Sequence, residues 1–298
     1  MKQDAAGHRA GTVALVGRPN VGKSTLLNRL VGQKLSITSA RPQTTRHRIV
    51  GIVSQPAAQF VFVDTPGLQS RHAGRLNRAL NRAASEAVES VDVVVLVLEA
   101  LRFGKEDRAV LARVPRGRPV ILALNKVDAI ADKTRLLPFI DELSRVHSFA
   151  AIVPISARTG RQVPELLAAI GPHLPAGAAM YAQHDLTDRS ERFLAAEFLR
   201  EKLFRLLGDE LPYATAVEVE RFETAGKLRR IGANIIVDRP AQKAIIIGQR
   251  GEKLKAIATQ ARQDMEQLFG SRVYLEVWVR VRRGWADDPR TLRSLGYE

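Results

Sequence analysis

The stretch that decides the fold is Gly17-Arg18-Pro19-Asn20-Val21-Gly22-Lys23-Ser24, which is followed by Thr25. The apolar run Val13 to Val16 precedes it and predicts a buried strand, and leucines at helical spacing follow it. This order of strand, glycine loop and helix is the context that a phosphate-binding loop requires. Lys23 can then reach the β- and γ-phosphates of a nucleotide, and Ser24 can ligate Mg²⁺. A strand-to-helix turn that binds nothing is the alternative, and the complete motif in this context disfavours it.

The composition is that of a globular protein with a polyanionic partner. At 298 residues the chain has room for two domains, and its 45% hydrophobic and 26% charged residues are ordinary proportions. A net charge of +15 favours nucleic acid or an acidic membrane surface, although a solvated basic surface explains the charge equally well. The excess is +11 in residues 1–185 and +4 in residues 186–298, so an RNA site must be located from a motif.

The cellular compartment is indicated by what the sequence lacks. The chain has no cysteine, which excludes disulfides and cysteine-bound metals and suits a reducing compartment. Its first eleven residues lack the apolar core of a signal peptide, and the longest apolar run, Val93 to Leu98, is too short to cross a bilayer. We therefore expect a cytosolic protein.

A polar, basic stretch over residues 33–48 has no sustained period and predicts a long functional loop. Its central residues are Gln43, Thr44, Thr45, Arg46 and His47. Two strand-like runs follow, Ile49 to Val53 and Phe60 to Val63, and the second leads into Asp64-Thr65-Pro66-Gly67. An aspartate at the carboxyl end of a buried strand predicts a second contact to Mg²⁺. The same four residues also suit an ordinary turn.

Base specificity is predicted by Asn125-Lys126-Val127-Asp128, which follows a strand at Val120 to Leu124. An aspartate at this place can accept hydrogen bonds from N1–H and from the exocyclic amine of guanine, whereas adenine offers neither donor. We expect Asn125 to tie this loop to the phosphate loop and the Lys126 stem to cover the base. A further strand, Ala151 to Ile155, ends at Ser156-Ala157, where a backbone N–H is expected to meet guanine O6.

Strands that alternate with helices predict a doubly wound, mainly parallel α/β sheet, with the nucleotide at the carboxyl ends of its strands. One helix is expected over residues 74–90, with arginines at 75, 78 and 82. These three and Arg71 are expected to contact either RNA or only water. Residues 12–174 resemble a translation-factor-related bacterial GTPase domain. The resemblance implies that Thr44 or Thr45 closes on Mg²⁺ in the GTP state. Thr45 is favoured because related GTPases place this threonine directly before an arginine.

The resemblance has one departure, at the residue after Gly67. Many Ras-type GTPases have a water-orienting glutamine there, whereas this chain has Leu68. Because leucine cannot orient water, we expect slow unaided hydrolysis, on the order of 10⁻⁴ to 10⁻² s⁻¹. In related GTPases an asparagine at the place of Asn20 helps to hold a potassium ion near the phosphates. The resemblance therefore makes Asn20 a candidate K⁺ ligand.

The second half of the chain is predicted to form a separate domain over residues 186–298, after a linker at 175–185. An amphipathic helix from about residue 188 to 208 is expected first. Two strands at 216–221 and 230–237, a helix that ends near residue 268 and a strand at 274–281 are expected after it. Trp278 and Trp285 are predicted either to stack on bases or to be, respectively, buried and ordinarily exposed.

An RNA site in this half is predicted by Gly248-Gln249-Arg250-Gly251, with Lys253 and Lys255 on the helix that follows. Two glycines between an apolar segment and a basic helix allow a nucleic-acid backbone to approach closely. The order of elements resembles a type II KH domain, which implies that Ala244 to Ile247 is helical although local propensity favours a strand. A KH fold that is kept as a protein-docking scaffold is the alternative.

The whole chain, apart from a tail at residues 1–10, resembles the bacterial GTPases of small ribosomal subunit assembly, with a GTPase domain at 11–174 and a carboxyl-terminal KH domain. The resemblance implies GTP and GDP as ligands and Mg²⁺ as cofactor. It also implies binding to the 3′ end of small-subunit ribosomal RNA, action on the 30S subunit and peripheral association with the inner membrane. A monomer is expected. A non-catalytic RNA-binding scaffold and a membrane GTPase with a KH-like docking module are the rival functions.

Overall fold

The computed structural model of the chain describes residues 7–39, 41, 44–64, 75, 78, 80, 82, 88–208 and 211–297. The chain forms two compact units. The first comprises Met1–Ser36, Thr45–Ser70 and Asn81–Asp188, and the second comprises Ile37–Thr44, Arg71–Leu80 and Arg189–Glu298. This division differs from the predicted boundaries, because the residues predicted as a linker group with the first unit and two short segments of the first half group with the second.

The first unit is built on a six-stranded sheet of order β2-β3-β1-β4-β5-β6. Its strands are β1 (Arg9–Val16), β2 (Ile49–Ser54), β3 (Ala58–Asp64), β4 (Val93–Glu99), β5 (Val120–Asn125) and β6 (Ala151–Pro154). In the described residues β2 pairs antiparallel with β3, and the remaining neighbours pair in parallel. The central strands are nearly continuous apolar runs because both faces of the sheet are covered. The predicted doubly wound, mainly parallel sheet is confirmed.

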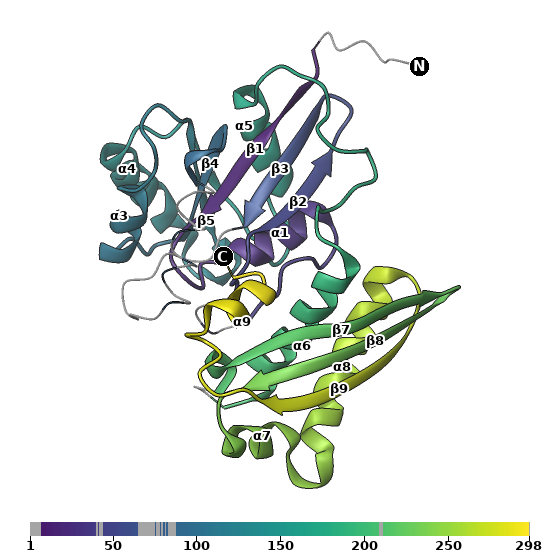
Figure 1. The fold of residues 1–298 in the computed structure, drawn as a ribbon. Coiled ribbons are helices and arrows are strands. Elements are labelled where there is room, and N and C mark those ends of the chain that lie inside the picture. The colour runs from purple at the N-terminus through teal and green to yellow at the C-terminus, as the bar shows by residue number, and fades with distance from the viewer. Residues whose placement is uncertain are drawn as a thin grey trace. The chain divides into compact units, whose positions relative to one another are not determined.

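Helices cover both faces of this sheet (Figure 1). They are α1 (Lys23–Val31), α3 (Lys105–Leu111), α4 (Leu136–Val146) and α5 (Val163–Ile170), with short 3₁₀ turns at Val127–Ala129, Lys133–Arg135 and Gly171–His173. On one face, Leu96 and Leu122 of the sheet belong to the same buried cluster as Val110 of α3 and Leu143 of α4. Helix α1 contacts β2 and β3, and α5 contacts β5 and β6. The carboxyl ends of the parallel strands are thereby fixed at one edge.

The predicted helix at 74–90 lies mostly outside the described residues. Of these positions, residues 75, 78, 80, 82, 88, 89 and 90 are described, and all but residue 90, which lies in a turn, are helical. The chain after α5 returns along the first unit, where the Ala10 N–H donates to Pro175 O. The Gln59 side chain then accepts from the N–H groups of Met180 and Tyr181. The residues predicted as a linker are therefore attached to the first unit.

The second unit is a three-stranded sheet of order β7-β8-β9 with two long helices, α6 and α8, on one face (Figure 1). Its elements are α6 (Glu191–Leu206), β7 (Thr215–Ala225), β8 (Leu228–Val237), α7 (Pro240–Ile247), α8 (Glu252–Phe269), β9 (Arg272–Val281) and α9 (Pro289–Ser294), with 3₁₀ turns at Leu211–Ala214 and Gln249–Gly251. Strand β8 pairs antiparallel with β7 and parallel with β9. Helix α7 confirms that Ala244 to Ile247 is helical. Among the described residues, no helix has the length and apolar character needed to span a bilayer.

Helix α9 was not predicted from the sequence, although local signals for it exist. Asp288 accepts hydrogen bonds from the backbone N–H groups of Arg290 and Thr291, which is the geometry of a helix N-cap. Pro289 occupies the first turn, where its missing N–H has no helical partner to lose. The helix is short and polar, and its position is fixed by Leu292, which packs in a buried cluster of the second unit.

Both tryptophans differ from the packing that was predicted for them, and base stacking by Trp278 stays a prediction. Trp285 is 1% exposed, packs with Leu292 and Tyr297, and donates from Nε1 to Ala214 O. It is therefore neither a base-stacking residue nor an ordinary surface residue. Trp278 is 46% exposed, so its predicted burial is wrong. Burial of Trp285 was missed because the covering helix α9 was missed.

Substituting each tryptophan by alanine tests this assignment. Trp285→Ala should lower the free energy of unfolding by about 3–5 kcal/mol, because it leaves a large cavity and an unpaired Ala214 carbonyl. Trp278→Ala is the matched control and should cost less than about 1 kcal/mol, because the ring is half in solvent. Urea denaturation of both variants measures the difference, and equal losses would contradict the packing described.

Candidate nucleotide-binding site and KH loop

Both glycines of the phosphate loop are required by its backbone. Gly17 has φ +155° and Gly22 has φ +104°, a range that side chains rarely adopt. A Cβ at Gly17 would lie 2.4 Å from Val97 O, and one at Gly22 would lie 2.3 Å from Asn125 Nδ2. The loop therefore packs directly against β4 and against the predicted guanine loop. Among its other residues Arg18 and Pro19 are half-buried, and Thr25 is half-buried in the first turn of α1.

Lys23 is a buried lysine held by the phosphate loop itself. Its Nζ donates to Gly17 O at 2.8 Å and to Arg18 O at 3.0 Å. Burial lowers the pKa of Lys23 to about 8, and the nearby Asp64 carboxylate opposes that shift. The ammonium group is thus poorly solvated, and a bound phosphate would supply the counter-charge that its surroundings only partly provide.

Three oxygen-bearing side chains meet at the end of β3 and fit a magnesium ion. Asp64 Oδ2 accepts from Ser24 Oγ at 2.7 Å, and Ser24 Oγ lies 2.9 Å from Thr45 Oγ1. Asp64 Oδ1 is buried without a hydrogen-bond partner, and burial raises the pKa of this carboxyl group. Carboxylate and hydroxyl oxygens are the ligands that Mg²⁺ prefers. Ser24, Thr45 and Asp64 would hold the ion, which would neutralise charge on the phosphates when bound.

The donor set contains a single carboxylate. Among the described residues, no group of three or more His, Asp or Glu side chains is placed to hold a metal ion. Mg²⁺ is usually held through one or two carboxylates together with substrate phosphates, so this site is suited to an ion that arrives with a nucleotide.

The structure separates the two candidate threonines. Thr44 Oγ1 donates to Arg41 O at 2.8 Å and pairs with Ser39 Oγ, whereas Thr45 Oγ1 lies beside Ser24 and Asp64. The geometry favours Thr45 as the magnesium ligand. Arg46 is buried and His47 is half-buried next to it. Gln43 and the four residues Thr65, Pro66, Gly67 and Leu68 lie outside the described residues, so their predicted roles stay predictions.

Asn125 connects three nucleotide-binding segments. Its Nδ2 donates to Val21 O of the phosphate loop at 2.8 Å, and its Oδ1 accepts from the Ala157 N–H at 2.9 Å. The predicted tie between the two loops is therefore present. The Ala157 N–H is engaged by this contact, and the Ser156 N–H donates to Arg161 O at 3.0 Å. The predicted contact of either N–H with guanine O6 therefore requires that its present hydrogen bond be shared or exchanged.

Asp128 is held as an ionised acceptor. Ser156 Oγ donates to its Oδ1 at 2.6 Å, and this hydrogen bond lowers the pKa of Asp128. A carboxylate that stays charged at neutral pH is what recognition of two N–H donors on guanine requires. Arg158 also pairs with Asp128 at 2.6 Å, which the sequence analysis missed.

Glu99 is the other residue that sequence reasoning missed. It ends β4 at the same edge of the sheet as Asp64 and Asn125. Its Oε2 pairs with Lys126 Nζ at 2.9 Å and with Arg18 Nη2 at 3.3 Å. Lys126, at φ +68°, thus has its charge fixed beside the sheet edge. Position at the carboxyl end of a buried parallel strand was the signal that could have identified Glu99.

The KH loop connects α7 to α8 in the second unit. Gly248 has φ +72°, and a Cβ there would lie 2.8 Å from Lys253 Cβ. Gly251 has φ +79° and open space where its Cβ would be, so a polynucleotide backbone can approach it. Of the other predicted RNA-binding residues, Gln249, Arg250 and Lys255 are exposed, and Lys253 is half-buried.

Comparison with protein families gives one match in each half of the chain. Residues 12–126 match the family described as 50S ribosome-binding GTPase, and residues 210–286 match the KH domain family. The fold and the site thus define a P-loop GTPase with a carboxyl-terminal KH domain. The chain is 55% identical over 294 residues to the GTPase Era of Nitrosomonas eutropha, covering 99% of each chain. It is also 55% identical to that of Chromobacterium violaceum, covering 97% of each. The chain belongs to the GTPase Era family and hydrolyses GTP.

Two solved structures of this family resemble the chain along nearly its whole length. One is a variant of Aquifex aeolicus Era bound to GDP.AlF4⁻, with a TM-score of 0.93 and 38% identity, covering 97% of this chain and 99% of that one. The other, with the same score, identity and coverage, is Era in complex with MgGDPNP and nucleotides 1506–1542 of 16S ribosomal RNA.

The lowered pKa of Lys23 predicts how nucleotide affinity changes with pH. Below pH 8 the ammonium is already charged, whereas above pH 8 the bound nucleotide must bring a proton to it. GTP affinity should therefore fall as pH rises above 8, by up to about tenfold per pH unit. Titrations with a fluorescent GTP analogue from pH 7 to pH 9.5 measure the slope.

The matched variant for this titration is Lys23→Arg. The arginine guanidinium group stays charged throughout this pH range. The affinity of the variant for GTP should therefore be weaker than that of the native protein, but without the pH dependence that comes from ionisation of residue 23. Any slope common to both proteins belongs to the nucleotide. Identical slopes in the two proteins would show that Lys23 does not titrate as its burial implies.

Proposed function

We propose that this GTPase is a nucleotide-gated RNA clamp that binds the 3′ end of small-subunit ribosomal RNA and acts in assembly of the 30S subunit. The exposed side chains beside Gly248 and Gly251 support RNA binding in the KH loop. The Era complex with MgGDPNP and nucleotides 1506–1542 of 16S ribosomal RNA supports this choice of RNA. Without a glutamine at position 68, GTP hydrolysis is expected to be slow until a partner assists it.

The observation that carries the gating is the double role of Asp64. Its Oδ2 accepts from Ser36 Oγ at 2.8 Å and from Thr45 Oγ1 at 3.5 Å, in addition to Ser24. Ser36 and Thr45 are the first-unit residues that flank Ile37–Thr44, and this intervening segment belongs to the second unit. The Asp64 carboxylate therefore holds the two residues that flank Ile37–Thr44, whereas the segment itself packs in the second unit.

The middle of that segment is anchored on helix α6. Glu201 is buried, and its Oε1 accepts from the Thr38 N–H at 3.0 Å. Arg205 donates to Thr38 O at 3.1 Å and to Thr38 Oγ1 at 2.9 Å. Arg41 donates to Leu207 O and Gly208 O, both at 2.8 Å, at the carboxyl end of the helix. These five hydrogen bonds make the segment part of the second unit.

Helix α6 packs on α8, and α8 begins directly after the KH loop. Binding of Mg²⁺ and GTP changes the partners available to Asp64 and Thr45, and so changes how the ends of Ile37–Thr44 are held. We infer that this biases the position of α6 and the presentation of the RNA groove. By linkage, RNA that favours the GTP form must tighten GTP binding by the same factor.

The test is the affinity for GTP, and the rate of single-turnover hydrolysis, with and without a 16S ribosomal RNA 3′-end oligonucleotide. Allosteric couplings are typically about 5–150-fold, so RNA should tighten GTP at least about fivefold and GTP should tighten RNA equally. In the control variant Arg250→Glu, which reverses an exposed charge of the KH loop, the RNA effect should be lost at unchanged intrinsic GTP affinity. RNA that binds the native protein and leaves both quantities unchanged would reveal two independent modules.

We also propose that Asn20 helps to hold a potassium ion beside the phosphates. Asn20 is exposed in the phosphate loop with φ +64°, a conformation that asparagine tolerates better than most residues. The ion would supply positive charge where other GTPases use an arginine. Hydrolysis should be faster in K⁺ than in Na⁺ at equal ionic strength. Asn20→Gly, which keeps the backbone conformation, should remove the difference, and equal rates in the native protein would rule the ion out.

The remaining expectations from the family resemblance concern location and assembly state. We propose that the protein acts in the cytoplasm as a monomer and associates peripherally with the inner membrane. The basic net charge of +15 supports contact with anionic lipids as well as with RNA.

A further inference from the structure

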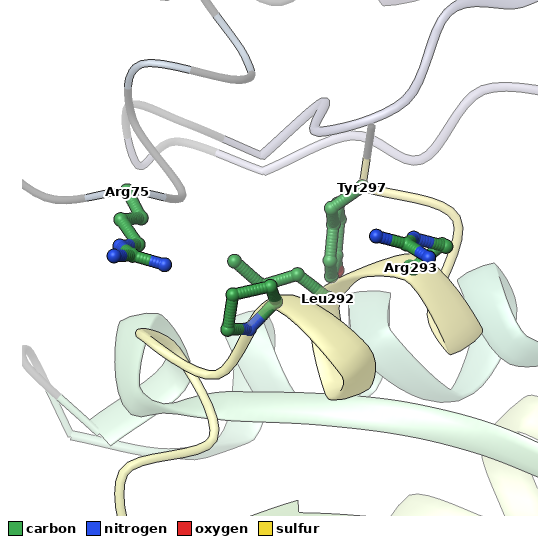
Figure 2. Close-up of a pocket in the computed structure, with 5 residues that line it drawn as sticks. Arg75, Leu292, Arg293 and Tyr297 are labelled. Carbon is green, nitrogen blue, oxygen red and sulfur yellow. The ribbon is translucent and has the colours of Figure 1, made fainter.

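A cavity of about 320 Å³ lies in the second unit. It is lined by Arg75, Pro289, Leu292, Arg293 and Tyr297 (Figure 2). Ligand pockets typically have volumes of about 300 Å³ or more and combine an apolar wall with a few polar groups. This cavity meets both conditions. We call it the Arg75 pocket.

The charges around the Arg75 pocket select an anion. Two of its five lining residues are arginines and none is acidic. Within the described part of the chain, Arg75 makes no hydrogen bond or ion pair. A ligand in the pocket would therefore meet the guanidinium groups of Arg75 and Arg293. Guanidinium groups bind phosphates through paired N–H donors.

The arrangement of the side chains narrows the ligand further. Figure 2 shows Arg75 on one side of Leu292 and Arg293 on the far side of Tyr297. An apolar wall thus lies between two cationic groups. A nucleotide in an RNA chain offers complementary groups, because its sugar joins two phosphates and its flat base projects from that sugar. The base can pack on a proline and tyrosine wall while the phosphates meet the arginines.

We propose that the Arg75 pocket binds one ribonucleoside phosphate and forms a second RNA contact, separate from the Gly248–Gly251 loop. On this proposal Arg75 contacts RNA. Of the two alternatives left open by the sequence, contact with RNA or with water alone, the proposal therefore chooses RNA for Arg75. The assignment of RNA as the source of this nucleotide rests on the proposed function. The chemistry of the pocket does not, because a free mononucleotide also carries a base, a sugar and a phosphate that one of the two arginines can bind.

The first experiment compares two RNAs on the full-length protein. One spans nucleotides 1506–1542 of 16S ribosomal RNA, as in the Era complex, and the other contains only its last ten or so nucleotides. Arg75→Ala and Arg293→Ala should each weaken the long RNA about fivefold to tenfold and reduce the slope of log affinity against log salt by about one. Neither should alter the affinity for GTP.

The matched control is Arg290→Ala. Arg290 is exposed on the same short helix and carries the same charge, but it does not line the cavity. Its loss should change the affinity for the long RNA less than twofold. If all three variants weaken binding equally, the arginines contribute only general charge and the pocket is not a site. If the short RNA loses as much affinity as the long one, the effect arises at the KH loop.

A second experiment probes the pocket directly, because the chain has no cysteine of its own. Pro289→Cys places a single thiol in the pocket wall, and Arg290→Cys places one just outside it. The long RNA should slow maleimide labelling of the first thiol at least about fivefold and leave the second unchanged. If AMP or GMP alone, at micromolar concentration, slows labelling of the first thiol, the ligand of the pocket is a free nucleotide. This conclusion would hold even if RNA failed to bind the native protein. No protection by either would overturn the proposal.

Discussion

The buried carboxylate of Asp64 is the constraint on which the switch depends. It lies at the carboxyl end of β3 and gathers the hydroxyl groups of Ser24, Ser36 and Thr45 from three different segments. Its second oxygen is buried without a hydrogen-bond partner, and the charge of Lys23 opposes the effect of burial on its pKa. A charged group in such a place is costly unless it is paired. The hydrogen bonds around Asp64 are therefore expected to change when a cation and phosphates bind.

Magnitudes suggest that this sensitivity is sufficient to move the loop. An intramolecular hydrogen bond is typically worth about 0.5–1.5 kcal/mol net, and those to charged groups somewhat more. Exchange of one or two of the hydroxyl contacts of Asp64 therefore involves a few kcal/mol. Coupling between allosteric sites is typically about 1–3 kcal/mol. The contacts of Ser36 and Thr45 with one carboxylate thus have the right size to bias a segment whose middle is fixed on α6.

The parts of the site that the sequence predicted are those in which backbone conformation dictates residue type. Gly17 and Gly22 could be identified because no other residue fits their φ values and the atoms beside them. Asp128 could be identified because guanine requires a carboxylate acceptor at the end of a strand, and Asn125 because it begins the same four-residue motif. The helical assignment of Ala244 to Ile247 followed from the KH resemblance and overrode its β-propensity. Each of these is a local rule or a fixed spacing.

The parts that the sequence did not predict depend on long-range packing. Trp285 is buried only because α9 folds over it, and that helix is too short to show a period. The anchoring of Thr38 and Arg41 on α6 joins residues more than 160 positions apart, and polar loop residues carry no signal for such partners. The resemblance favoured Thr45 over Thr44 without excluding Thr44, and the position of Asp64 beside Thr45 supports that choice.

The central claim is that Ile37–Thr44 transmits nucleotide state to the KH unit, and Arg41→Ala tests it most directly. The measurement is the ratio of GTP affinities with and without the 16S ribosomal RNA oligonucleotide, in this variant and in Arg48→Ala, which removes an exposed charge outside the segment. The ratio should fall toward one in Arg41→Ala, with GTP affinity and RNA affinity each within about twofold of native, and stay native in Arg48→Ala. A native ratio in Arg41→Ala would show that the anchor on α6 does not carry the coupling.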